Sequence, residues 1–347
     1  MASAVLLEGL HIPLTTPFAA DGSVALDKLE RNVARYSKTP AAGLIILGPS
    51  AEPSLLSDDE TSDVLRTAAQ AAAPEKVLIA GIARDSVRSV LALADFAAQH
   101  RYDAILISYP LVTNTYPEFL AYFQTIADRS PLPIILGSTE RHTISGVTVA
   151  ELSQHPNIIG LLSSEPDSDF ARIPVNDLQR QVTVTTTFAA VTARMQLAAE
   201  TAPPPALVSA ASLTSSATAV AEPPTQAPAL RTRTKSVGFQ ILSGNSGSLL
   251  DALNANATGI APAFAAAAPQ ACYEVYAAWK DGDAPLAEEK QHRIREAAAL
   301  AESLGPGGLK YACDLNGYAA GLQRLPHLPP TGEQRAALEA LMQGLHN

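Results

Sequence analysis

Short apolar runs of strand length alternate along the chain with longer stretches that have helical spacing. The runs are almost continuously apolar, which is typical of parallel strands that are covered on both faces. Parallel neighbours need a crossover connection, and the helical stretches supply it. Eight such runs predict an α/β fold of the (β/α)8 TIM-barrel type. The runs cover residues 11–16, 43–48, 77–82, 104–109, 133–138, 158–163, 239–244 and 259–264.

Two helix starts carry a capping sequence. Ser57 with Glu60, and Thr148 with Glu151, each place a glutamate three positions after a hydroxyl residue. In such a capping box the hydroxyl and the carboxylate each accept a hydrogen bond from a backbone N–H that has no partner within the helix. We therefore expect helices to begin directly after Ser57 and Thr148.

One segment interrupts this regular succession. Residues 201–230 are rich in Ala, Pro, Ser and Thr and show no apolar periodicity. We interpret residues 199–236 as a low-complexity insertion in a barrel of residues 1–270, followed by a C-terminal helical extension of residues 271–347. Because the insertion leads from a helix into a strand, we expect it at the N-terminal face of the barrel, disordered and without a catalytic role.

Composition narrows the class of protein. The 347 residues are 47% hydrophobic and carry a formal net charge of −10, which indicates a globular protein and argues against nucleic acid as a partner. No apolar run approaches the roughly 20 residues of a membrane span, and the N-terminus has no basic leader. Cys272 and Cys313 lack the spacing of a zinc or redox motif. We expect a cytoplasmic protein with reduced core thiols, no membrane contact, no metal and no cofactor.

The segment around the second predicted strand resembles a known family. Residues 41–60 read AAGLIILGPSAEPSLLSDDE, and the segments at 9–18, 80–97 and 239–260 follow in the order and spacing of the dihydrodipicolinate synthase / N-acetylneuraminate lyase family. The resemblance covers nearly the whole chain except the insertion. It implies a Schiff-base aldolase or dehydratase that acts on pyruvate or another 2-oxo acid. It also implies a homo-oligomer, either a dimer or a tetramer.

The amine that this chemistry requires is missing. In the family a lysine on the sixth strand condenses with the 2-oxo group, and the iminium then draws in electrons from the adjacent carbon. The family pattern there is Gly-Ile-Lys-Glu or Gly-Ile-Lys-Asp, whereas residues 160–165 of this chain read GLLSSE. Leu162 stands at the lysine position, or Ser163 if the register shifts by one. The chain has no lysine between Lys76 and Lys235.

Other family features at the same end of the barrel are also altered. The proton-relaying tyrosine of the family follows the fifth strand, where residues 137–140 of this chain read GSTE. Pro49 replaces the first residue of a hydroxyl pair after the second strand, and Ser50 remains to bind a carboxylate together with loop N–H groups. Glu52 matches a family glutamate, and we expect it to bond the backbone. Lys310 resembles a helix residue that is not the Schiff-base amine, and we expect it at the surface.

Several polar residues at strand ends are candidates for a different chemistry. Tyr109 either donates a proton or packs as a buried side chain, and His142 is a candidate general base near neutral pH. Arg141 either pairs with a substrate carboxylate or stays in an exposed loop. Further candidates for contacts to a small carboxylate or 2-oxo acid are Ser50, Ser138, Ser164 and Asn245.

Two functions remain open at this point, and a standard Schiff-base aldolase is a third only if an amine arrives from elsewhere. One is a divergent enzyme that performs a lyase, dehydratase or isomerase step with acid–base groups instead of an amine. The other is a catalytically inactive member that binds a ligand or a partner protein. An enzyme should keep a cavity lined by converging polar groups. An inactive member is expected to fill that cavity with apolar side chains such as Leu162 and Leu111.

Overall fold

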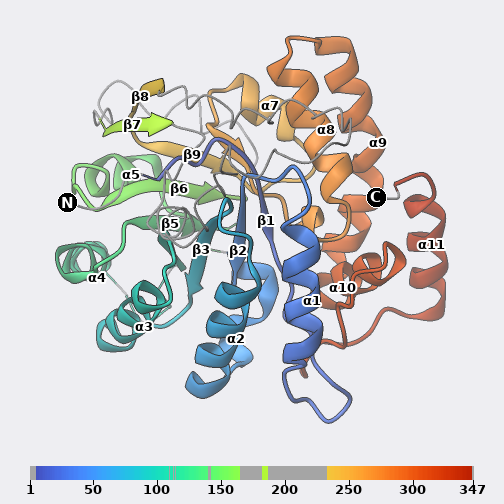
Figure 1. The fold of residues 1–347 in the computed structure, drawn as a ribbon, viewed down its shortest axis with the longest axis horizontal. Coiled ribbons are helices and arrows are strands. Elements are labelled where there is room, and N and C mark those ends of the chain that lie inside the picture. The colour runs from blue at the N-terminus through green and yellow to red at the C-terminus, as the bar shows by residue number, and fades with distance from the viewer. Residues whose placement is uncertain are drawn as a thin grey trace, which may run out of the picture.

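Eight parallel strands close into a barrel that helices surround (Figure 1). Neighbouring strands pair in the order β1-β10-β9-β6-β5-β4-β3-β2, and β1 closes the ring by pairing with both β10 and β2. The predicted (β/α)8 barrel is therefore confirmed. The strands are β1 (Gly9–Pro13), β2 (Gly43–Ile46), β3 (Val77–Ile82), β4 (Ala104–Ser108), β5 (Ile134–Ser138), β6 (Ile158–Ser163), β9 (Gln240–Ser243) and β10 (Gly259–Ile260).

This computed structural model describes most of the chain outside the insertion. The described residues are 5–108, 110, 111, 113, 115–139, 142–164, 182–186 and 233–345.

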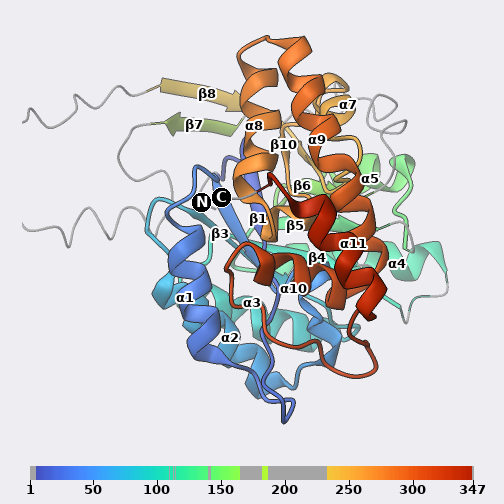
Figure 2. The ribbon, with the colours of Figure 1, turned by 90° about the vertical axis from the view of Figure 1, so that its right-hand side faces the viewer.

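Helices cover the outside of the barrel, and further helices follow at the C-terminus (Figure 2). α8 packs against β1, α9 packs on α8, and α10 and α11 pack on α9. The predicted C-terminal extension of residues 271–347 thus contains most of α8 together with α9, α10 and α11. The helices are α1 (Leu26–Tyr36), α2 (Asp58–Ala71), α3 (Val87–Gln99), α4 (Tyr116–Arg129), α5 (Gly146–Leu152), α7 (Leu249–Asn254), α8 (Pro269–Lys280), α9 (Ala284–Ser303), α10 (Gly305–Leu315) and α11 (Gly332–Met342).

The barrel strands are buried on both faces, which explains their continuously apolar sequence. In β4, Ile105 and Ile107 belong to the apolar cluster that includes the surrounding helices, whereas Ala104 and Leu106 belong to a second cluster inside the barrel. Leu162 of β6 joins the interior cluster. Because side chains alternate along a strand, the six strands from β2 to β6 and β9 contribute to both clusters.

A histidine lies inside the barrel. His11 on β1 is in register with Gly43 on β2, and a Cβ on Gly43 would lie 2.4 Å from His11 Nδ1 and 2.6 Å from the Val77 carbonyl oxygen. Only glycine leaves room for the imidazole at this point. Neither ring nitrogen makes a hydrogen bond of good geometry to a described residue. Burial lowers the pKa of His11 to about 4, so the ring is neutral at neutral pH.

The two predicted capping boxes have different outcomes. Ser57 Oγ accepts from Glu60 N at 3.2 Å, and Glu60 Oε2 accepts from Ser57 N at 3.0 Å, which confirms the first box at the start of α2. The second prediction is wrong, because Ser145 is the N-cap of α5 and accepts from Thr148 N at 3.2 Å. Thr148 therefore lies one turn inside the helix. Ser145, a hydroxyl residue three positions before Thr148, is the N-cap instead.

One short strand precedes the predicted insertion, and a second overlaps its C-terminal end. β7 (Val182–Thr186) and β8 (Arg233–Val237) pair antiparallel and lie apart from the barrel in Figure 2. β8 ends shortly before β9 begins, so this segment rejoins the barrel at the N-terminal end of β9. Residues 233–236, which the sequence analysis assigned to the insertion, thus belong to a strand. The rest of the interval that we expected to be disordered, 199–232, lies outside the described residues.

Candidate active site at the mouth of the barrel

Two adjoining cavities lie at the C-terminal ends of the barrel strands. The first has a volume of about 570 Å³ and the second about 400 Å³, and both are lined by Pro49, Thr139, Gly305 and Pro306. Pro49 follows β2 and Thr139 follows β5, whereas Gly305 and Pro306 begin α10. The cavities therefore share walls at the end of the barrel where the chemistry of this fold takes place.

Polar side chains from several loops converge on the first cavity. Ser108 ends β4, Asp85 follows β3 and His142 follows β5. His327 lines the same cavity from the loop between α10 and α11. Asp85 Oδ1 accepts a hydrogen bond from Leu111 N at 2.7 Å, which joins the loops after β3 and β4.

The second cavity carries hydroxyl and amide groups that the sequence analysis selected. Ser50, Ser164 and Asn245 all line it, from the loops after β2, β6 and β9. A Cβ on Gly244 would lie 2.7 Å from Ser164 Oγ, so the glycine lets β9 approach this hydroxyl closely. Three predicted substrate-binding residues are thus brought together in one cavity.

A carboxylate from α9 also lines the second cavity. Glu302 Oε1 accepts hydrogen bonds from the Ser246 hydroxyl and from Phe264 N, the latter at 3.1 Å. These bonds fix the carboxylate beside the loops that follow β9 and β10. Sequence reasoning missed Glu302 because it belongs to a helix of the C-terminal extension and not to a strand end.

The inward-facing side chain of β6 below the cavity is apolar. Gly160, Leu162 and Ser164 occupy every second position and lie on the inner face. Leu162 is 4% exposed and belongs to the interior cluster. Among the described residues that line the two cavities, none is a lysine. The described walls therefore carry hydroxyl, amide, imidazole and carboxylate groups but no amine.

Lys310 is buried, which corrects the expectation of a surface position. Its Nζ lies 2.5 Å from Glu52 Oε1 and also donates to the Leu322 carbonyl oxygen at 2.7 Å. The ammonium group sits 4.5 Å from the centre of the Phe18 ring. Burial lowers the pKa of Lys310, and Glu52 opposes that shift. A helix position that looks polar in sequence is thus internal because the loop after β2 covers it with a matching charge.

Arg324 holds the loop after α10 against the barrel. Its backbone N–H donates to Glu52 Oε2 at 2.9 Å, which confirms the backbone-bonding role expected for Glu52. Its guanidinium group pairs with Glu60 at 2.5 Å and donates to the Leu55 carbonyl oxygen at 2.6 Å. The hydrogen bonds from Arg324 lower the pKa of Glu60 to about 2. The C-terminal extension is therefore a fixed part of the cavity wall.

Arg84 lines the first cavity but is already committed to the protein. Its Nε and Nη2 donate to Asp58 at 3.2 and 3.0 Å, and Nη2 also donates to Thr61 at 3.0 Å. Its Nη1 donates to the carbonyl oxygens of Pro53 and Ala83 at 3.5 and 3.0 Å. A guanidinium group has five N–H donors, so these bonds leave Arg84 little capacity to bind a ligand carboxylate.

The remaining predicted site residues divide into two groups. Ser138 lines neither cavity, because its side chain is buried behind β5, where Oγ accepts from Ile144 N at 2.9 Å. Its role is to hold the loop after β5. Tyr109 and Arg141 lie outside the described residues, and their roles stay predictions.

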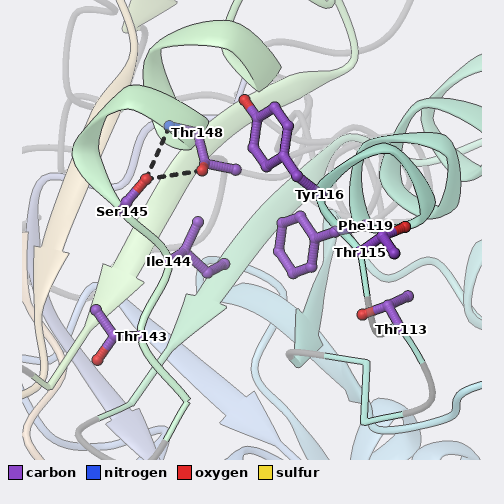
Figure 3. Close-up of a pocket in the computed structure, with 8 residues that line it drawn as sticks. All are labelled: Thr113, Thr115, Tyr116, Phe119, Thr143, Ile144, Ser145 and Thr148. Atoms are coloured by element: carbon purple, nitrogen blue, oxygen red, sulfur yellow. Dashed lines mark hydrogen bonds between the residues drawn. The ribbon is translucent and has the colours of Figure 1, made fainter.

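A third cavity of about 270 Å³ lies between α4 and α5 (Figure 3). In Figure 3 the Phe119 ring faces Ile144 and the Tyr116 ring lies beside Thr148, which forms hydrogen bonds with Ser145. These hydroxyl groups serve the cap of α5, and the Tyr116 hydroxyl donates to a glutamate at 2.6 Å. Because its polar groups are engaged in helix caps and side-chain bonds, this cavity is a weaker candidate site.

The described residues show neither a metal site nor a membrane span. Within them, no group of three or more His, Cys, Asp or Glu side chains is placed to hold a metal ion. None of the helices searched in that part of the chain has the length and apolar character needed to cross a bilayer.

The sequence and the fold were compared with those of known proteins. The sequence model of the Dihydrodipicolinate synthetase family matches residues 6–182 and 225–345. The chain belongs to this family. The interval that the family match leaves out falls within the interruption between β6 and β9. Membership places the protein among relatives named as lyases and synthases, and it confirms the resemblance stated from sequence.

Relatives in the family include enzymes with two different names. The chain is 26% identical to a 4-hydroxy-tetrahydrodipicolinate synthase of Acidiphilium cryptum, over 98% of this chain and 99% of the relative. It is 34% identical to an N-acetylneuraminate lyase of Rhizobium meliloti, over 46% of this chain and 55% of the relative. The fold is shared with the prophage protein YagE of Escherichia coli K12, which was solved in complex with pyruvate. That match has a TM-score of 0.76 and 20% identity, over 98% of this chain and 99% of YagE.

Proposed function

We propose that this family member binds a small 2-oxo acid or a related carboxylate in the two adjoining cavities and acts on it as a lyase without a lysine Schiff base. The observation that carries the proposal is Leu162, which takes the inward position on β6 two residues before Ser164, a residue that lines the second cavity. An apolar side chain cannot condense with a carbonyl group. The proposed reaction therefore uses acid–base groups in place of an amine.

The polar lining supports a carboxylate ligand. Ser50, Ser164 and Asn245 offer hydrogen-bond donors in the second cavity. Gly305 and Pro306 bring the first turn of α10 to both cavities, and the partial positive charge of a helix N-terminus favours an anion. His142 is the proposed general base, because an imidazole can accept a proton near neutral pH.

A second candidate function is a catalytically inactive family member that binds a ligand or a partner protein. Two apolar side chains favour it, because Leu162 fills the inward position of β6 and Leu111, on the rim of the first cavity, is 64% exposed. Because single exposed leucines are common on protein surfaces, Leu162 is the stronger of these two observations. The two functions differ in turnover and share the absence of an amine.

Borohydride trapping tests the amine-free proposal. The protein is incubated with pyruvate or another 2-oxo acid, reduced with borohydride and analysed by intact mass, beside a thermal-shift screen of the same acids. We expect no adduct and a ligand-induced rise in Tm. A covalent adduct on any lysine overturns the proposal. Binding without consumption of any tested acid, followed by NMR, favours the inactive member.

The family resemblance also leads us to infer a homodimer or homotetramer in the cytoplasm. Light scattering after size exclusion measures the mass of the particle in solution. A mass of one chain at micromolar concentration contradicts the inferred assembly.

A further inference from the structure

The third cavity, between α4 and α5, is separate from the mouth of the barrel. None of the eight described residues that line it lines either mouth cavity. Its volume is about 270 Å³, and an apolar cavity of about 150 Å³ in a protein already holds benzene. We infer that this cavity is a further binding site, which takes a small neutral molecule with an aromatic ring. The inference does not depend on the proposed function.

Aromatic side chains form one wall of the cavity (Figure 3). Tyr116 and Phe119 both belong to the first turn of α4, and the Phe119 ring faces Ile144 of the loop before α5. The ring of Phe123, which does not line the cavity, lies 4.9 Å from that of Phe119 and is tilted by 52°. Aromatic pairs favour tilted or offset arrangements with centroids about 4.5–7 Å apart. A ligand ring beside Phe119 would therefore extend an existing aromatic cluster.

Two threonines of the lining hold the loops on either side of the cavity. In the loop after β4, Thr113 Oγ1 donates to the Pro110 carbonyl oxygen at 3.1 Å. In the loop after β5, Thr143 Oγ1 donates to the Thr139 carbonyl oxygen at 3.4 Å. Both bonds stay within their loop, so they help to form the walls before a ligand arrives. A preformed site avoids the entropic cost of ordering its walls on binding.

Three other hydroxyl groups serve the starts of the two helices. Thr115 Oγ1 accepts from Glu118 N at 3.4 Å in α4, and Ser145 Oγ accepts from Thr148 N at 3.2 Å in α5. The hydroxyls of Ser145 and Thr148 also bond each other at 2.8 Å. With the bond from Tyr116 to Glu151, all six hydroxyl side chains of the described lining are bonded to the protein. A ligand therefore gains little from polar contacts that would have to replace these bonds.

The described lining of this cavity carries no charged side chain. None of its eight residues is Asp, Glu, Lys, Arg or His. An ion that left water for this cavity would lose hydration without meeting an opposite charge among these residues. The two rings, the isoleucine and the threonine methyl groups favour apolar surface instead. The lining thus suits a neutral ring such as phenol better than a charged molecule of the same size.

An NMR titration of the full-length protein with phenol tests the inference. Phenol is neutral at about pH 7, because its pKa resembles that of a tyrosine side chain. We expect saturable binding of phenol. Benzoate and benzylammonium carry the same ring with a negative or a positive charge, and each should bind at least about tenfold more weakly.

Two pairs of variants locate the binding site. Thr143→Phe adds a ring to the lining, whereas Val147→Phe adds the same ring on α5 at a position that is 76% exposed and does not line the cavity. Thr143→Phe should weaken phenol binding at least about tenfold, and Val147→Phe should bind phenol like the wild type. Tyr116→Ala should weaken binding about tenfold, while Tyr116→Phe keeps the ring and should retain binding. Thermal unfolding of each variant checks that it is folded.

The inference is overturned if the wild type shows no saturable binding of phenol, or if either charged molecule binds as tightly as phenol does. Normal phenol binding by both Thr143→Phe and Tyr116→Ala also overturns it, because phenol then binds elsewhere. If Thr143→Phe does not fold, the two Tyr116 variants decide. None of these results depends on a 2-oxo acid at the mouth of the barrel, so the proposed function and this inference can fail separately.

Discussion

Glu52 and Lys310 form an ion pair between side chains that are 0% and 1% exposed, with 2.5 Å between Oε1 and Nζ. The two residues are separated by 258 positions in the sequence. Glu52 belongs to the loop after β2 and lines the first cavity, and Lys310 belongs to α10. This pair therefore couples the wall of the candidate site to the folding of the C-terminal helices.

Replacing Lys310 with methionine should destabilise the protein strongly. The substitution leaves the Glu52 carboxylate buried without its cation, and breaking a buried pair in this way costs about 3–5 kcal/mol. The free energy of unfolding from urea titration measures the loss. The control is Lys280→Met, which removes a pair with Glu8 whose lysine is half exposed, and it should cost less than about 1 kcal/mol. Equal losses for both variants contradict a stabilising role of the buried pair.

His11 should make the protein less stable in mild acid. Its pKa is about 4 when folded against 6.5 for the ordinary group, so the unfolded chain binds a proton that the folded chain does not. Stability is therefore complete above about pH 6.5 and is lost as the pH falls towards 4. Urea titrations should show that the wild type loses about 2 kcal/mol of stability relative to His11→Val when the pH is lowered from 7.5 to 5.

The exposed His292 provides the control for this pH effect. His292→Val, measured at both pH values, should change stability little, because the side chain is exposed and its replacement disturbs little packing. The interpretation of His11 fails if His11→Val loses as much stability in acid as the wild type does.

Introducing a lysine in place of Leu162 should place an amine at the inward position of β6. This position lies two residues before Ser164, which lines the second cavity, and burial lowers the pKa of a lysine towards that of a nucleophilic amine. We expect Leu162→Lys to give a borohydride-reduced adduct with pyruvate that intact mass detects. Leu111→Lys, on the exposed rim, serves as the control and should stay unlabelled. An unlabelled but folded Leu162→Lys would show that the family lysine aligns elsewhere.

Two serines near the mouth should behave differently when each is replaced by alanine. Ser164 lines the second cavity, so Ser164→Ala should weaken pyruvate binding about threefold to tenfold with little loss of stability. Ser138 bonds Ile144 N instead, so Ser138→Ala should cost about 1–3 kcal/mol of stability, because it leaves a buried N–H without its acceptor. Calorimetric titration and urea unfolding of both variants measure the two effects. The assignment is wrong if the pattern is reversed.

The sequence predicted which residues follow the strands, but it did not predict for each of them whether the side chain points into the mouth of the barrel. Ser50, Ser164, Asn245 and His142 were selected as residues that follow strands, and all four line the mouth cavities. Ser138 was selected by the same rule, yet it faces away, because neighbouring residues of a strand point to opposite faces. Counting the alternation from the interior residues of β5 would have shown this.

Contributions from the C-terminal helices were hidden in the sequence. Glu302 and His327 line the cavities, and Lys310 is buried against Glu52. Helical spacing marks such residues only as polar positions and does not say which other element covers them. A lysine in an otherwise apolar turn of α10, between Leu309 and Ala312, was the one available sign of a buried charge.

The sequence alone determined the barrel, its family and the absence of a lysine from the sixth strand. Apolar runs and capping residues act over a few positions, so local patterns carry that information. Only the tertiary structure decided that the C-terminal extension forms part of the mouth, that Glu52 pairs with Lys310 and that His327 shares a cavity with His142. Burial and Coulomb attraction act between groups that folding brings together, and sequence distance does not report that proximity.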